Sequence, residues 1–366
     1  MHLARMLSLR PVPAAGVAVA VTRRCPLGCR HCSTASLRRG EQLPGEPISR
    51  FIGSFGEGEP PDVLLLTGGE PLLRPSLVAA LAASARLAGT ASCVVTGMFF
   101  ATADGALPGA IERALLSVDH VVASVDRFHQ EHVPLANVLA VVRRLVDAGR
   151  DASFQITSSG GGGGQDAHLA RTIDTIREAF DDRVPILVGA LEPVGRAATL
   201  VVGGGGGAGA RERWPVGEPC AVAAWPVVRW DGAVVACANQ SVLDAAEPPA
   251  HLTLGHIAAD GWSAIRERVV ATPEIRSVRT LGPGALGCAG CRELHRDPDA
   301  TARVHAWGRQ SAAPLVEAAV LDAQRRGGAV GFARRYGSAR HASLVTLGWD
   351  EGDGPGRARG EALCDA

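Results

Sequence analysis

The sequence is poor in aromatic side chains, which make up 4% of its 366 residues and include a single tyrosine, Tyr336. The core must therefore be mainly aliphatic, and surfaces for ring stacking are scarce. An excess of charge is also lacking, because Lys plus Arg and Asp plus Glu number 37 each. Charge alone thus gives no reason to expect a nucleic-acid partner.

Long apolar runs are lacking as well. The longest near the N-terminus, residues 15–21, is far too short to span a bilayer, and no small-residue cleavage site follows it. Its valines alternate with small residues, which is typical of a buried strand. The nine cysteines are mostly grouped, which fits metal or redox sites better than a disulfide framework. We therefore expect a cytoplasmic protein that does not bind a membrane.

Short β-branched runs alternate with amphipathic stretches from residue 15 to about 195. This alternation predicts an α/β fold with a parallel sheet and right-handed crossovers, either a partial barrel or an open sheet. The predicted strands are 16–22, 62–67, 91–97, 120–125, 152–158 and 184–191, and the clearest helices are 76–89, 137–149 and 168–180.

Composition divides the chain further. We predict a core domain over 1–200, a smaller domain richer in Trp, Pro and Cys over 201–310, and a helical extension with a mobile tail over 311–366. Two polyglycine runs, 160–164 and 203–207, lack the pattern of a phosphate-binding loop, so we interpret them as flexible loops.

Residues that can carry chemistry follow the first two predicted strands. Cys25, Cys29 and Cys32 share the first loop, and three thiolates at this spacing can hold a [4Fe–4S] cluster with one iron left open. The sequence TGGEP, residues 67–71, follows the second strand. The carboxyl ends of parallel strands form the active site in such folds. Three unrelated cysteines, or a zinc site completed by His31, are the alternatives.

Taken together, CxxxCxxC after the first strand and GGEP after the second resemble the signature of the radical S-adenosylmethionine (SAM) superfamily. The resemblance implies a partial (β/α)6 barrel in which SAM binds the open iron through its amino and carboxylate groups. It assigns the SAM amino group to the turn formed by Gly68, Gly69, Glu70 and Pro71. The residue before the third cysteine is commonly aromatic in this family, whereas here it is His31.

Weaker matches follow in the order of the family. VVTG at 94–97 resembles its third-strand segment, Ser124 and Asp126 stand where polar side chains reach the SAM ribose or carboxylate, and Gly195 lies in a segment similar to one near adenine. The resemblance also implies an external electron donor of the flavodoxin or ferredoxin type. Reduction then splits SAM into methionine and a 5′-deoxyadenosyl radical, which abstracts hydrogen from a substrate carbon.

A second group of cysteines comprises Cys220, Cys237, Cys288 and Cys291. Residues 227–237 predict a β-hairpin with an Asp-Gly turn, which together with the CAGC loop could close a site of four thiolates. The spacing resembles the twitch and SPASM extensions of radical SAM enzymes, which implies one auxiliary [4Fe–4S] cluster. Structural zinc is the alternative. We expect Cys93 to be buried and Cys364 to be incidental.

The segment DRFHQEHVP, residues 126–134, follows the fourth strand. His129 or His132 could face the substrate and relay a proton, with Glu131 nearby. The alternative is a solvated helix start with capping carboxylates.

We expect an enzyme that oxidatively modifies a ribosomally made peptide, by a crosslink or a thioether. Only 24 residues precede Cys25, which leaves no room there for a leader-recognition domain. A small-molecule alcohol or sugar dehydrogenase is the second candidate, and a non-catalytic iron–sulfur or zinc protein is the third. No cobalamin-binding region is evident.

Overall fold

The computed structural model describes residues 1–158, 166–202, 219–282, 291 and 294–343. Both polyglycine runs, Cys288, Cys364 and the C-terminal tail lie outside the described residues. The predicted boundary near residue 200 adjoins one of these gaps, and the division into three domains stays a prediction.

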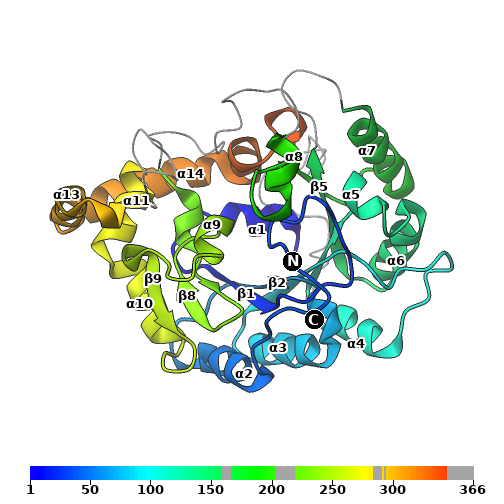
Figure 1. The fold of residues 1–366 in the computed structure, drawn as a ribbon, viewed down its shortest axis with the longest axis horizontal. Helices are drawn as coiled ribbons and strands as arrows, with labels where there is room; N and C mark the ends of the chain where they lie inside the picture. The colour runs from blue at the N-terminus through cyan, green and yellow to red at the C-terminus, as the bar shows by residue number, and fades with distance from the viewer. Residues whose placement is uncertain (159–165, 203–218, 283–290, 292–293, 344–366) are drawn as a thin grey trace, which may run out of the picture.

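The described strands form one nine-stranded sheet in the order β6-β5-β4-β3-β2-β1-β7-β8-β9. Pairing is parallel from β6 to β7, and β8 runs antiparallel to β7 and β9. Within the described part of the chain, β6 and β9 are edges, so the predicted partial barrel is confirmed (Figure 1). The strands are β1 Gly16–Thr22, β2 Val63–Gly68, β3 Ala91–Thr96, β4 His120–Ser124, β5 Asp151–Ser158, β6 Ile186–Ala190, β7 Val227–Val228, β8 Ala233–Val235 and β9 Thr253–His256.

Strand β1 explains why this sheet is covered on both sides. All seven of its residues are buried, and Val17, Val19 and Val21 face the outer helices. An unbroken apolar strand of this kind is stable only between two layers. The outer layer surrounds the sheet in Figure 1 and consists of α2 Gly45–Gly53, α3 Pro75–Leu87, α4 Gly109–Ser117, α6 Leu135–Asp147 and α7 Ala167–Phe180.

The inner face of the sheet is closed at the amino ends of the strands. Helix α1 (Leu3–Leu9) and the end of α14 (Ala313–Tyr336) pack there against Val63, Cys93 and Val122. Cys93 is fully buried, as predicted. Because apolar residues fill the amino edge, the loops at the carboxyl edge are left to form a site.

The remaining helices belong to the second half of the chain, apart from a short turn after β4. They are α5 Arg127–Gln130, α8 Ala198–Val202, α9 Gln240–Leu243, α10 Trp262–Ala271, α11 Pro273–Leu281, α13 Pro298–Gly308 and α14. None of the described helices is both long and apolar enough to cross a membrane.

The predicted hairpin is confirmed. Strands β7 and β8 pair antiparallel, and Gly232 takes a φ of +93° in the turn between them. An Asp-Gly pair suits such a turn because glycine adopts positive φ without strain. The hairpin extends the main sheet beside β1.

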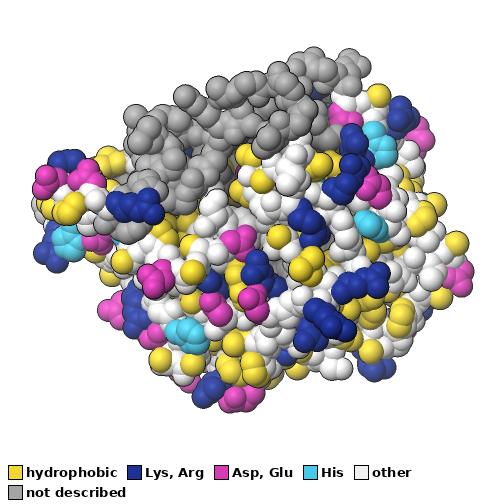
Figure 2. Space-filling view, in the orientation of Figure 1, with side chains coloured by type: hydrophobic (Ala, Val, Ile, Leu, Met, Phe, Trp, Pro, Cys, Tyr) yellow, Lys and Arg dark blue, Asp and Glu magenta, His cyan; other side chains and the backbone are white. Residues whose placement is uncertain are grey.

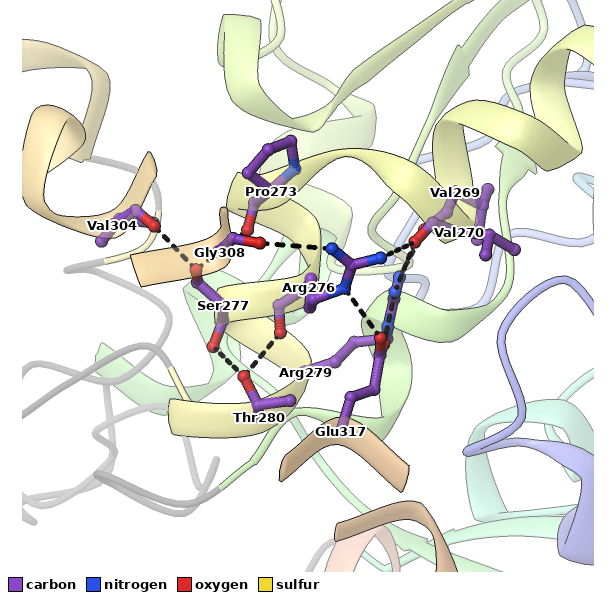
Figure 3. Close-up of polar contacts among 10 residues, drawn as sticks. All are labelled: Val269, Val270, Pro273, Arg276, Ser277, Arg279, Thr280, Val304, Gly308 and Glu317. Atoms are coloured by element: carbon purple, nitrogen blue, oxygen red, sulfur yellow. Dashed lines mark hydrogen bonds and ion pairs between the residues drawn. The ribbon is translucent and has the colours of Figure 1, made fainter. Parts of the chain in front are cut away.

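An ion-pair cluster around the buried Arg279 joins the C-terminal helices (Figure 3). Glu317 of α14 accepts hydrogen bonds from Arg276 Nε at 3.0 Å and from Arg279 Nε at 2.7 Å, both on α11. Ser277 Oγ donates to Val304 O of α13 at 2.8 Å. These contacts fix three helices in one arrangement behind the hairpin.

Candidate active site

The cysteine loop, residues 23–40, begins where β1 ends. Cys29 is buried, whereas Cys25 and Cys32 are half-buried, and all three are free thiols. Backbone bonds shape the loop: Cys25 N donates to Leu37 O at 2.9 Å and Cys32 N donates to Cys29 O at 3.2 Å. Three thiols thus lie together at the carboxyl edge of the sheet.

The GGEP turn packs directly on the strand end that leads into this loop. Gly69 N donates to Thr22 O at 2.6 Å, and Glu70 N donates to Arg24 O at 2.8 Å. A Cβ atom at Gly68 would lie 2.4 Å from Thr22 O, and one at Gly69 would lie 2.2 Å from Arg24 O. Gly68 also has a φ of +126°. Both positions therefore require glycine for the close approach of two backbones.

Glu70 joins the second and third strand ends. Its Oε1 accepts from Leu72 N at 2.9 Å, and its Oε2 accepts from Thr96 Oγ1 at 3.0 Å and Gly97 N at 2.9 Å. The side chain is 1% exposed, and burial raises its pKa to about 7 despite these bonds. The Glu70 carboxylate therefore holds the ends of β2 and β3 together. Its contact with the SAM amino group stays a prediction.

Asp126 is buried and bonded within the protein. Its Oδ1 accepts from the backbone N–H groups of Phe128 and His129, which makes it the N-cap of α5. Its Oδ2 accepts from His129 Nδ1 at 3.0 Å and from His31 Nε2 at 3.1 Å. Although burial opposes ionisation, these two histidines hold the pKa of Asp126 well below its usual range. The expected contact of Asp126 with SAM stays a prediction.

The two candidate histidines lie against the cysteine loop. His129 contacts Cys29, and although burial opposes its charge, Asp126 and Cys29 raise the pKa of His129 to about 10. The His132 ring lies beside Gly28, where a Cβ would be 3.6 Å from its Cε1. Glu131 pairs with Arg30 at the surface. The segment 126–134 thus forms a capped helix start, and its histidines also contact the cysteine loop.

His31 stacks on Phe128, with ring centroids 4.6 Å apart and an interplanar angle of 12°. His31 occupies the position that is commonly aromatic in the family that the sequence resembles, and its ring stacks on another ring in this chain. Ser124, the last residue of β4, is half-buried, and Pro71 is buried at the start of a 3-10 turn, Pro71–Leu73.

Arg196 is a site residue that the sequence reasoning missed. Its Nε donates to Cys29 O at 2.9 Å, its backbone N donates to Cys32 O at 3.0 Å, and Nη1 donates to Ser36 O. Gly195 has a φ of +56°, and a Cβ there would lie 2.1 Å from Ser33 O. The segment after β6 thus clamps the cysteine loop. Only the adjacent Gly195, taken from a weak match, pointed to it.

The donor set fits an iron–sulfur cluster. Burial, reinforced by the nearby acidic groups of Glu70, Cys32 and Cys29, raises the pKa of the Cys25 thiol to about 12. Neutral thiols crowded in this way become favourable thiolates once cationic iron binds. Cys25, Cys29 and Cys32 would hold the cluster, with the fourth iron open.

Residues 19–176 match the radical SAM superfamily. The chain contains a radical SAM domain. This domain starts within β1 and ends within α7, so it carries the cysteine loop and the GGEP turn but not Arg196. A radical SAM domain implies a [4Fe–4S] cluster and SAM as cofactors. No curated protein matches the sequence significantly.

Solved structures similar to the chain include Streptococcus suis SuiB bound to SAM, with 12% identity, 69% of this chain covered and a TM-score of 0.48. Others are anSMEcpe with SAM and the Cp18Cys peptide, with 13% identity, 84% coverage and 0.42, and BtrN with SAM and 2-DOIA, with 14% identity, 73% coverage and 0.39. The matches cover 65%, 99% and 87% of those chains, so this chain spans less than two thirds of SuiB. Likenesses this distant assign no substrate.

The described members of the second cysteine group lie apart from the cysteine loop in the chain. Cys220 precedes β7 and Cys237 follows the antiparallel β8, so both lie toward the amino edge. Cys237 and Cys291 pack on one apolar cluster with Val235 and Leu252. Cys291 Sγ lies 3.8 Å from His251 Nε2. The auxiliary cluster, and the choice between iron–sulfur and zinc, stay predictions.

Proposed function

We propose that this chain uses a [4Fe–4S] cluster on Cys25, Cys29 and Cys32 to cleave SAM reductively and to abstract hydrogen from a carbon atom of a ribosomally made peptide. The observation that carries the SAM-cleaving part is the convergence of the cysteine loop, the GGEP turn and the Arg196 clamp at one edge of the sheet. When bound and reduced, the cluster supplies the electron that splits SAM into methionine and a 5′-deoxyadenosyl radical.

The residues of the chain fix the geometry for that step. Gly68 and Gly69 let the turn touch the backbone of the cysteine loop, and Glu70 ties the turn to β3. Arg196 holds the carbonyl of Cys29 from the opposite side. A loop braced from two sides would hold its three thiols, and therefore a bound cluster, in a fixed position.

A peptide substrate is supported by an open cleft beside the loop. The cleft measures about 460 Å³, and its lining includes Arg23, Glu41, Trp230 and Asp244. Arg23 lies 3.9 Å above the Trp230 ring and pairs with Glu41 and Asp244. Figure 2 shows acidic and basic side chains interspersed on the face of the molecule that it draws. A cleft that is open and of mixed charge suits an extended chain better than a small apolar ligand.

The finer proposal is an oxidative crosslink or thioether, with the substrate electron passing to an auxiliary cluster on Cys220, Cys237, Cys288 and Cys291 in a twitch-like region. An external flavodoxin- or ferredoxin-type protein would reduce the first cluster. SuiB has been solved with its precursor peptide SuiA, and BtrN with 2-DOIA. The second candidate, a small-molecule dehydrogenase, would use the same radical step.

The test is anaerobic reconstitution with iron and sulfide, followed by reduction and measurement of 5′-deoxyadenosine. Short peptides encoded beside the gene are then added, and their masses are measured. A peptide that loses two hydrogen atoms supports the full proposal. Turnover only with alcohols or sugars supports the dehydrogenase, and an intact reduced cluster without SAM cleavage points to a non-catalytic protein. A Cys29→Ala variant is the control.

A further inference from the structure

A second set of metal-ligand atoms overlaps the proposed cluster site. Among the described residues, one group of three such side chains has its ligand atoms within 4.8 Å of one another: Cys29, His31 and His129. The side chains of His31 and His129 are 10% and 16% exposed. This set shares only Cys29 with the proposed cluster ligands.

Both histidines are oriented by the same carboxylate. Asp126 Oδ2 accepts from His31 Nε2 and from His129 Nδ1, which leaves Nε2 of His129 on the side of Cys29. The other nitrogen of His31, Nδ1, is buried and has no hydrogen-bond partner among the described residues. Histidine ligands of metals usually donate their second ring N–H to a carboxylate in this way.

We propose that the chain without its cluster binds one Zn²⁺ ion through Cys29, His31 and His129, with water as the fourth ligand, and that this ion excludes the iron–sulfur cluster. Exclusion follows because both metals require the Cys29 thiolate. On binding, Zn²⁺ displaces the thiol proton of Cys29 and any proton on the ring nitrogens that become ligands. The exclusion rests on the proposed function, whereas the zinc site itself does not.

The donor set and the spacing suit zinc. Mixed sulfur and imidazole ligands favour Zn²⁺ over Mg²⁺ or Ca²⁺. Ligand bonds of about 2.0–2.3 Å in a tetrahedron place ligand atoms roughly 3.3–3.8 Å apart. Because the three ligand atoms lie within 4.8 Å of one another, each pair must approach by about 1.5 Å or less. A loop residue and a short helix, which carry His31 and His129, can shift by that amount.

The test titrates the cluster-free chain with Zn²⁺, and with Co²⁺ as a spectroscopic probe, under anaerobic conditions. His31→Gln and His129→Gln should each lower the bound metal by about one equivalent relative to the unsubstituted chain. Asp126→Asn should weaken binding about 10- to 100-fold, as for other residues that orient metal ligands. Comparison with the unsubstituted chain cancels any metal held by the second cysteine group.

Matched variants separate this site from one made by the three cysteines. Cys25→Ser combined with Cys32→Ser should leave zinc binding unchanged, and so should His132→Gln, whose ring lies beside Gly28 instead of Cys29. Circular dichroism checks that each variant is folded. The proposal is overturned if His129→Gln binds zinc normally, or if loss of Cys25 and Cys32 removes it.

The exclusion is tested by loading iron and sulfide with and without one equivalent of Zn²⁺. We expect the zinc-loaded chain to gain less iron at the first site, and the His129→Gln chain to gain the same iron in both cases. Equal iron loading of the unsubstituted chain would disprove exclusion. If the chain forms 5′-deoxyadenosine but binds no zinc at Cys29, His31 and His129, the zinc site is disproved and the proposed function is not. If it binds zinc there but does not cleave SAM, the proposed function is disproved and the zinc site is not.

Discussion

The two cysteine groups differ in how their members are placed along the chain. Cys25, Cys29 and Cys32 share one loop at the carboxyl edge, and backbone contacts from the GGEP turn and Arg196 hold that loop. Cys220, Cys237 and Cys291 come from separate segments toward the amino edge. Local spacing therefore creates the first group, whereas the predicted second group would depend on how the hairpin packs against the C-terminal segments.

The largest effect is expected when a cysteine of either group is itself substituted, which compares the two groups directly. Cys29→Ala should abolish 5′-deoxyadenosine formation and remove about four irons per chain, because a cluster with two remaining thiolates is unstable. Cys291→Ser should remove only auxiliary metal and leave SAM cleavage measurable. Iron analysis and product chromatography check both. Loss of SAM cleavage in Cys291→Ser alone would mean that the two groups are not independent.

Glu317→Gln tests the support of the second group. Cys220 N donates to Val278 O of α11, and Glu317 neutralises Arg279, which is 4% exposed on that helix. Removing one partner of a buried pair should lower the free energy of unfolding by about 3 kcal/mol. Urea unfolding measures it. The matched control is Glu46→Gln, from the exposed pair with Arg50, for which we expect a change of about 0.5 kcal/mol or less.

Arg196→Met tests the clamp on the first group. The side chain loses charged hydrogen bonds to Cys29 O and Ser36 O, each worth about 1.5–3 kcal/mol when made. We expect iron release from the reconstituted protein to a chelator to become at least about tenfold faster, since 1.4 kcal/mol corresponds to tenfold. Arg183→Met, which removes an exposed pair with Asp181, is the control. Equal release rates would show that the clamp does not hold the loop.

The smallest effect is expected at the rim of the same loop. Glu131→Gln removes the surface pair with Arg30, whose side chains are 38% and 53% exposed. Water and salt screen such pairs, so iron release and SAM cleavage should match those of the unsubstituted protein. A marked change would show that the surface pair of Glu131 and Arg30 stabilises the loop, which would contradict the role given to Arg196.

Much of the fold could be predicted from the pattern of apolar residues. The six strands predicted before residue 200 lie within two residues of their observed ends, and the Asp-Gly hairpin is present. Helices α2 and α4 were not among the helices named from the sequence, and each begins at a Pro-Gly pair, Pro44–Gly45 and Pro108–Gly109, which is a signal typical of a turn. The attachment of β7 to β1 was not predictable either, since strand pairing across the chain leaves no local signal.

For the candidate site, too, some residues could be predicted from the sequence and others could not. Cys25, Cys29, Cys32 and the GGEP turn were predictable because short spacing and topology place them at one edge. Arg196 and Thr96 lie in segments with weak family matches but were not named as site residues, since an arginine or a threonine acquires such a role only through the partners that folding brings to it. The bonds of Asp126 to two histidines were not predictable from the sequence, and its expected contact with SAM stays a prediction.

The sequence by itself determined the alternation of strands and helices and the loop that carries three thiols, because both depend on neighbours within a few residues. Tertiary structure alone decided which side chains brace that loop and which histidines reach Cys29. Those contacts join residues far apart in the chain, and their free energy exists only when the sheet has formed.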